Sequence, residues 1–312
     1  MMYLLKENFD KAREALAGAY AVVVPDEVLP PKDALFPRSE TLYETDRRTG
    51  EARAAGAGGK TLLFGVRPCD ARAIGNLDAA FLESGYVDAN YAQRRENATI
   101  VALACAQIPS PACFCDSMGG SPHEAPEADV VLTEAADGSG YALDFQSEKG
   151  SAVAEIWKAA DLIGPMPAHL EKAPAPTCTL KVNKVPDLAQ KLTAAFEDGL
   201  WERLAEACLG CGCCTYVCPT CYCFDIGLEN RGGTADTFRC WDSCMFPGYT
   251  QMAGGHNPRW SKTQRLRNRY LHKLAYFDER YGRTLCVGCG RCICRCPQGL
   301  DITRAVEWGE RL

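Results

Sequence analysis

The stretch CLGCGCCTYVCPTCYC, residues 208–223, contains seven cysteines in sixteen residues. Three kinds of structure explain such a density of thiols: disulfide bridges, a zinc site or an iron–sulfur cluster. The whole chain has 19 cysteines, an odd number, and its first residues, MMYLLKENFDKAREAL, lack the apolar core of a secretion signal. A cytoplasmic, reducing and anaerobic setting is therefore predicted, and disulfides become the weakest of the three explanations.

Two cysteine runs with identical spacing favour iron–sulfur clusters over zinc. Each run has the form C-x2-C-x2-C-x3-C-P, which is the bacterial ferredoxin pattern in which the fourth cysteine binds the other cluster. A zinc site usually takes two ligands from each of two short loops, whereas each loop here offers three. We therefore predict two 4Fe-4S clusters: one bound by Cys208, Cys211, Cys214 and Cys296, and one by Cys286, Cys289, Cys292 and Cys218. The extra Cys213 and Cys294 are predicted to be buried small side chains.

The first half of the chain contains four further cysteines, which equals the ligand count of a 4Fe-4S cluster: Cys69, Cys105, Cys113 and Cys115. Apolar runs at 60–67 and 98–105 are typical of buried strands. If these strands are parallel neighbours, Cys69 and Cys105 both lie at the carboxyl edge of the sheet, where α/β folds bind ligands. A third cluster is predicted there; the alternative is four reduced thiols.

The remaining pattern predicts an α/β (mixed) N-terminal domain and a mostly α-helical, ferredoxin-like C-terminal domain. Their predicted bounds are 1–165 and 185–312, with a Pro/Ala-rich linker at 166–184. Helical spacing predicts helices near 3–18, 70–83, from 185 into the first cysteine run, and over 261–282. Strands are predicted near 19–24, 60–67, 98–105, 128–135 and 141–146, the last two joined by a hairpin-like turn.

Residues 258–273 carry six basic side chains and no acidic one: Arg259, Lys262, Arg265, Arg267, Arg269 and Lys273. One explanation is a solvated helix face. The other is that cations offset the negative charge of a thiolate-bound cluster and raise its potential. The net charge of −6 excludes general nucleic-acid binding, and no apolar run is long enough to span a membrane.

Several motifs give the chain a specific resemblance that covers most of its length. These are LFGVRPCDARAI (63–74), CFCDS (113–117), CPTCYCFDI (218–226), RCWDSCM (239–245), AGGHNPR (253–259), HKLAYF (272–277) and CVGCGRC (286–292). In them the sequence resembles the β subunits of sulfhydrogenases and the related A subunit of anaerobic sulfite reductase. The resemblance implies a dicluster electron-transfer subunit of a multi-subunit oxidoreductase.

Two functional hypotheses follow. In the first, the chain relays single electrons between a flavin- or NAD(P)H-dependent module and a terminal hydrogenase, sulfite reductase or heterodisulfide-reductase-like module. It has no Gly-rich nucleotide loop of its own and no hydrolase signature, so a non-catalytic subunit is favoured. In the second, the N-terminal part binds a flavin or a disulfide substrate, and Cys221, Cys223, Cys240 and Cys244 form a reactive site or a further cluster.

Overall fold

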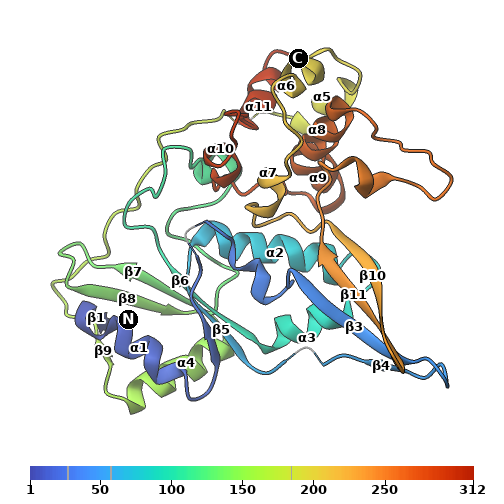
Figure 1. The fold of residues 1–312 in the computed structure, drawn as a ribbon. Helices are drawn as coiled ribbons and strands as arrows, with labels where there is room; N and C mark the ends of the chain where they lie inside the picture. The colour runs from blue at the N-terminus through green and yellow to red at the C-terminus, as the bar shows by residue number, and fades with distance from the viewer. Residues whose placement is uncertain (27, 57, 184) are drawn as a thin grey trace. The chain divides into compact units, whose positions relative to one another are not determined.

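The computed structural model describes residues 1–26, 28–56, 58–183 and 185–312 (Figure 1). Within these residues the chain forms two compact units. The α/β unit comprises Met1–Leu35, Ala57–Leu180 and Val287–Cys289, and the C-terminal unit comprises Phe36–Gly56, Lys181–Cys286 and Gly290–Leu312. Neither unit is therefore continuous in sequence: residues 36–56 belong to the C-terminal unit, and residues 287–289 belong to the α/β unit.

The α/β unit is built on a mixed sheet with the strand order β2-β5-β6-β7-β8-β1-β9. The pairs β2–β5, β5–β6 and β6–β7 are parallel, and β8 and β1 continue the sheet antiparallel. The predicted hairpin joins β7 to β8, and the predicted parallel pairing of the strands before Cys69 and Cys105 is confirmed. The strands are β1 (Met2–Leu5), β2 (Ala21–Val23), β5 (Thr61–Val66), β6 (Ala98–Leu103), β7 (Val130–Glu134), β8 (Gly140–Phe145) and β9 (Ile163–Pro165).

Helices cover both faces of this sheet, because its strands carry apolar side chains on both sides. Leu62, Phe64 and Val101 point to the face on which α1 (Phe9–Leu16) and α4 (Glu148–Ala159) pack, with Trp157 at the centre of that core. Figure 1 shows α1 and α4 together on one side and α2 (Pro68–Leu82) on the other. The remaining elements are α3 (Ala89–Asn97), η1 (Lys6–Asn8), η2 (Pro31–Ala34) and η3 (Cys115–Met118).

The predicted helix over 3–18 is wrong at its start. Met2–Leu5 form strand β1, which lies between β8 and β9, and Leu4 is fully buried in the sheet core. The helix begins only at Phe9. A short apolar run is compatible with a helix or with a strand. Here the run forms a strand, because β8 and β9 both pair with it.

The C-terminal unit contains most of the short helices and a second sheet, with the order β10-β11-β3-β4. Its strands are β10 (Phe224–Arg231), β11 (Thr234–Trp241), β3 (Ser39–Asp46) and β4 (Ala52–Ala54), and all neighbouring pairs are antiparallel. A buried ion pair fixes β11 to β3: Arg239 Nε donates to Glu40 Oε1 at 2.8 Å. The β10–β11 hairpin was not predicted from the sequence.

The helix predicted from residue 185 into the first cysteine run is interrupted. It forms α5 (Leu188–Ala194) and α6 (Leu200–Ala205), separated by a turn at 195–199. The helix predicted over 261–282 is continuous but changes its winding. It consists of α8 (Lys262–Leu271), the π-helical turn η5 (His272–Tyr276) and α9 (Phe277–Tyr281). A capping box of Ser261 and Gln264 begins it. The unit also contains α7 (Cys213–Tyr216), η4 (Pro247–Thr250), α10 (Arg291–Cys294) and α11 (Thr303–Gly309).

Over the residues that the structure describes, no helix is both long enough and apolar enough to cross a bilayer.

Candidate metal centres

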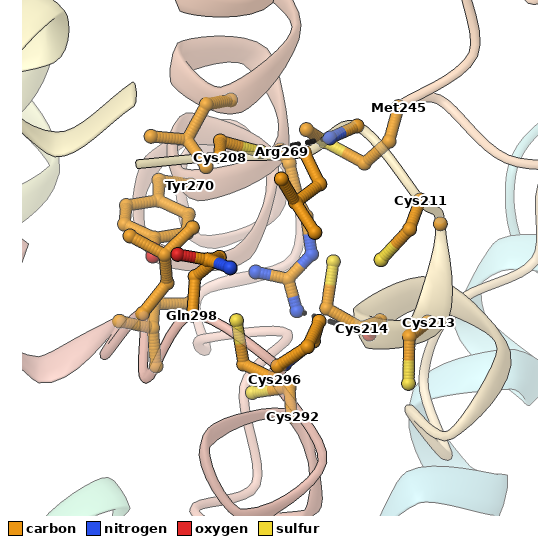
Figure 2. Close-up of a pocket in the computed structure, with 17 residues that line it drawn as sticks. Cys208, Cys211, Cys213, Cys214, Met245, Arg269, Tyr270, Cys292, Cys296 and Gln298 are labelled. Atoms are coloured by element: carbon orange, nitrogen blue, oxygen red, sulfur yellow. Dashed lines mark hydrogen bonds between the residues drawn. The ribbon is translucent and has the colours of Figure 1, made fainter. Parts of the chain in front are cut away.

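A pocket in the C-terminal unit brings together some of the cysteines of both runs. It has a cavity of about 30 Å³, and the thiols on its wall belong to Cys208, Cys211, Cys213, Cys214, Cys292 and Cys296. Four of these residues are the set that the sequence predicts for one cluster (Figure 2). Cys292 belongs to the other predicted set and borders the same pocket. The fourth cysteine of the second run, Cys296, thus lies with the first three of the first run.

Glycines in left-handed conformation give the first cysteine loop its shape. Gly210 and Gly212 have φ angles of +68° and +76°, which L side chains rarely adopt. The Gly210 N–H points to Cys208 Sγ at 3.4 Å, as expected for a backbone that presents amides to cluster sulfurs. A Cβ at Gly212 would lie 2.8 Å from the Phe246 ring. The second run repeats this conformation, with φ of +66° at Gly288 and +72° at Gly290, so equal spacing gives equal backbone.

Cys218 lies outside the first pocket and has its own partners. Its Sγ is 3.3 Å from Thr220 Oγ1, and it is buried beside Cys221. The hydrogen bond with Cys221, and then the nearby charges of Lys273 and Arg269, hold the pKa of Cys218 well below its usual range. Cys218 also raises the pKa of Cys292, after the larger effect of burial. Two members of the second predicted set therefore lie close together.

The π-helical turn η5 positions Cys286, a third member of that set. The Lys273 carbonyl accepts hydrogen bonds from the backbone N–H groups of Leu285 at 3.0 Å and Cys286 at 3.3 Å. The wider winding of a π turn frees carbonyls for such outside partners, and such turns occur often at functional sites. Cys289, the remaining member, belongs to the α/β unit and is described there.

Three of the six basic side chains in 258–273 are buried, so a solvated face does not account for them. Arg265, Arg269 and Lys273 are 6%, 3% and 2% exposed. Their side chains donate hydrogen bonds to neutral acceptors, which include the Met245 carbonyl for Arg265, the Cys214 carbonyl for Arg269 and Thr220 Oγ1 for Lys273. A buried cation is costly unless negative charge lies nearby.

Cysteine side chains would supply this negative charge as thiolates, free or bound to a cluster. Burial would lower the pKa of Arg269, but Cys214 and Cys292 more than reverse this, and the pKa lies above its usual value. The pKa of Lys273 is raised in the same way, with Cys218 and Cys221 opposing the effect of burial. Figure 2 shows the Arg269 guanidinium among the thiols of the pocket. These two cations thus lie where anionic thiolates, or a cluster bound by them, are expected.

The pocket residues fit a 4Fe-4S cluster. The wall offers four or more thiols, and each thiolate of such a cluster binds a different iron. The Arg269 Nε is buried and, within the described residues, has no hydrogen-bond acceptor. A buried donor without an acceptor is destabilising, and a cluster sulfur or a ligating thiolate would accept from it.

The additional cysteines of the C-terminal unit have different surroundings. Cys223 and Cys244 form a hydrogen-bonded pair; this bond is the main cause that lowers the pKa of Cys223 to about 6 and raises that of Cys244. Cys240 lies on β11 opposite Asp225, and burial raises its pKa. Cys294 is exposed, so the prediction that it is buried is wrong; Cys213 is half-buried, with Sγ 3.3 Å from the Arg295 carbonyl.

A second pocket lies within the α/β unit and brings together all four cysteines of the first half. Cys69, Cys105, Cys113 and Cys115 line a cavity of about 20 Å³. Burial raises the pKa of Cys105 to about 11 and is the main cause of the raised pKa of Cys115.

Two residues lie at or near this second pocket that the sequence analysis did not place there. Cys178 Sγ lies 3.7 Å from Cys115 Sγ, and Cys289 lines the pocket. In the sequence Cys178 is an isolated cysteine in a Pro-rich stretch. Its distance in sequence from the CFC motif matches no known ligand spacing, so the contact with Cys115 was not predicted. Cys289 was predicted, but as a ligand elsewhere.

Comparison with known proteins agrees with these observations. The family model of a 4Fe-4S dicluster domain matches residues 207–300, the segment that contains both cysteine runs. Sulfhydrogenase 2 subunit beta of Pyrococcus furiosus is 34% identical over 288 residues, which are 90% of this chain and 82% of that protein. The resemblance inferred from the sequence motifs is thereby confirmed, and the chain carries a domain for two 4Fe-4S clusters. The chain belongs to the family of sulfhydrogenase beta subunits.

Proposed function

We propose that this iron–sulfur subunit is a relay without substrate chemistry of its own. It would pass single electrons between a flavin- or NAD(P)H-dependent module and a terminal hydrogenase or reductase module of a cytoplasmic complex. The name of the Pyrococcus relative supports an assembly of several subunits. A 4Fe-4S cluster supplies one-electron chemistry, and a hydride donor or a two-electron substrate needs another cofactor.

The observation that carries the proposal is the pocket of Cys208, Cys211, Cys214 and Cys296 with Arg269 buried among the thiols. We assign these four residues to one cluster, and Cys218, Cys286, Cys289 and Cys292 to the other. The chain's own residues bind and shield the clusters, and Arg269 and Lys273 offset their charge. Lys262 steadies the first loop, since its Nζ donates to the Cys208 carbonyl at 2.9 Å.

The experiment uses the full chain, purified under anaerobic conditions. It should accept electrons from a low-potential donor and pass them to a one-electron acceptor. It should show no turnover with sulfite, hydrogen or NAD(P)H, and denaturation should release no flavin. Robust turnover with any of these substrates, or stoichiometric flavin, would contradict the relay.

One observation supports a second candidate, a reductase site at Cys223 and Cys244. The two thiols are hydrogen-bonded, and Tyr249 also bonds to Cys223, so a thiolate is stabilised there. Low thiol pKa values accompany reactive cysteines. A Cys223→Ser variant separates the two functions: the relay predicts unchanged electron transfer through the clusters, and the reductase predicts loss of disulfide reduction.

A further inference from the structure

The pocket of the α/β unit gathers thiols from three separate parts of the chain. Cys69 lies in the first turn of α2, directly after strand β5, and Cys105 follows strand β6. Because β5 and β6 are parallel neighbours, both residues lie at the carboxyl edge of the sheet. Cys113 lies in the loop before η3, and Cys115 is the first residue of η3. The sheet therefore brings single cysteines together that are far apart in sequence.

The pocket of the C-terminal unit can be compared with the pocket of the α/β unit in cavity volume and in the residues that line it. The cavities are about 20 Å³ and about 30 Å³, and each is lined by several cysteines. The remaining wall of the smaller cavity is largely apolar, with Pro68, Ile108, Pro109 and Pro122, and Arg67 supplies a positive charge. Thiols, an apolar wall and a cation are the features that the two pockets share.

Gly288 and Cys289, from the second ferredoxin-type run, also line this pocket. The Phe114 N–H donates to the Gly288 carbonyl at 2.8 Å, and Cys113 Sγ lies 3.8 Å from the Cys289 carbonyl. The approach is close, because a Cβ at Gly288 would lie 2.5 Å from the Phe114 carbonyl oxygen. The CFC loop thus packs against the backbone of a residue that we assign to a cluster.

We propose that this pocket binds a third 4Fe-4S cluster through Cys69, Cys105, Cys113 and Cys115, adjacent to the cluster that Cys289 helps to bind. The adjacency rests on the proposed function, whereas the site itself does not. Zinc fits the ligands less well, since structural zinc sites take C-x2-C-type pairs and this pocket offers two single cysteines and a C-x-C pair. The third cluster would extend the relay into the α/β unit.

Cys178 is not a ligand in this proposal. It does not line the cavity, it is 2% exposed, and its backbone N–H donates to Asp116 Oδ2 at 3.2 Å. It lies behind Cys115, with the two sulfur atoms 3.7 Å apart. Cys178 is therefore a matched control: a buried thiol beside the site whose removal should leave the cluster in place.

The test measures iron, sulfide and zinc in the full chain, produced and purified without oxygen. Wild type should contain about twelve irons, roughly four for each cubic cluster. Cys105→Ala and Cys113→Ala should each lower this to about eight, and Cys178→Ala should not. Retention of the two other clusters' EPR signals shows that the variants are folded. Wild-type iron near eight that neither variant changes, or one zinc per chain lost in both variants, would overturn the proposal.

The adjacency has its own readout. In the reduced wild-type chain, magnetic coupling to the third cluster should broaden the EPR signal of a neighbouring cluster, and Cys105→Ala should remove that part of the broadening. Broadening that is the same in both proteins contradicts the adjacency. Failure of the proposed function is distinguishable, because it would appear as substrate turnover or bound flavin in the wild-type chain, whatever Cys105→Ala does to the iron content.

Discussion

The two units bring their cysteines together in opposite ways. In the C-terminal unit, one loop of seven residues presents four thiols, three of them assigned as cluster ligands, and left-handed glycines set its shape. In the α/β unit, each strand end supplies a single thiol, and the order of the parallel sheet decides which ones meet. The first arrangement is encoded locally and is visible as a motif. The second exists only after the sheet has formed, so its integrity depends on a distant core.

The largest expected effect is the loss of a whole cluster from the locally encoded site. Cys218→Ala should remove about four irons and the EPR signal of the cluster assigned to Cys286, Cys289 and Cys292, while the other cluster stays. The exposed Cys294 is the control, and Cys294→Ala should keep all iron. If Cys218→Ala instead removed the cluster at Cys208, Cys211 and Cys214, the exchange of ligands between the runs would be wrong.

The dependence of the α/β pocket on its core is tested next. Trp157 on α4 is fully buried and donates from Nε1 to the Ala12 carbonyl of α1 at 2.8 Å. Trp157→Ala should lower the free energy of unfolding of this unit by about 3–5 kcal/mol, measured by denaturant titration. Trp260→Ala, at a side chain that is 71% exposed, should change it by less than about 0.5 kcal/mol. Equal effects would show that the core does not support the unit as described.

Gly288 tests the close packing of the CFC loop. Gly288→Ala combines a strained φ of +66° with a clash against the Phe114 backbone. Gly138→Ala has a similar φ of +72° and open space around it, so it carries the conformational cost alone, about 1–2 kcal/mol. The loss of unfolding free energy should be larger for Gly288→Ala. The same loss of unfolding free energy in both variants would mean that the CFC loop moves away from residue 288 without destabilising the protein.

The smallest effect concerns charge. Arg269→Gln should lower the reduction potential of a cluster in the C-terminal unit, because a buried cation favours the more negative, reduced state. A unit charge about 4–7 Å away in an effective dielectric near 20 corresponds to roughly 100–180 mV for a one-electron couple. Arg267→Gln, on the same helix but paired with Glu197 and the Phe196 carbonyl, should shift the potential much less. Redox titration followed by EPR decides, and equal shifts would remove the special role of Arg269.

The sequence revealed the features that depend on local pattern. Three features could be predicted from the sequence: the spacing of the cysteine runs, the β7–β8 hairpin, and the apolar strands β5 and β6. The β10–β11 hairpin was missed although Phe224, Ile226 and Leu228 alternate along β10, and in the structure Ile226 and Leu228 are exposed rather than part of a core. Its signal was the Gly232–Gly233 pair, which is typical of a tight turn between strands.

Burial of charge was not predictable in the same way. Arg269 and Lys273 lie in a segment whose composition is typical of a solvated face, since charged side chains are rarely buried without partners. Their neighbours include cysteines from other parts of the chain, so only the assembled unit shows why burial is tolerated. Cys178 was missed for a related reason: its contact with Cys115 spans 63 residues and follows no spacing rule.

Strand β3 has a consequence for how the protein is made. Its Glu40 pairs with Arg239, which is synthesised 199 residues later. Because a growing chain emerges from its N-terminus, β3 is synthesised long before β11, the strand that pairs with it. Until β11 arrives, β3 presents an unpaired edge of the kind that other strands join. Such a distant pairing also slows folding, so this hairpin-like segment is where we expect a chaperone to be needed most.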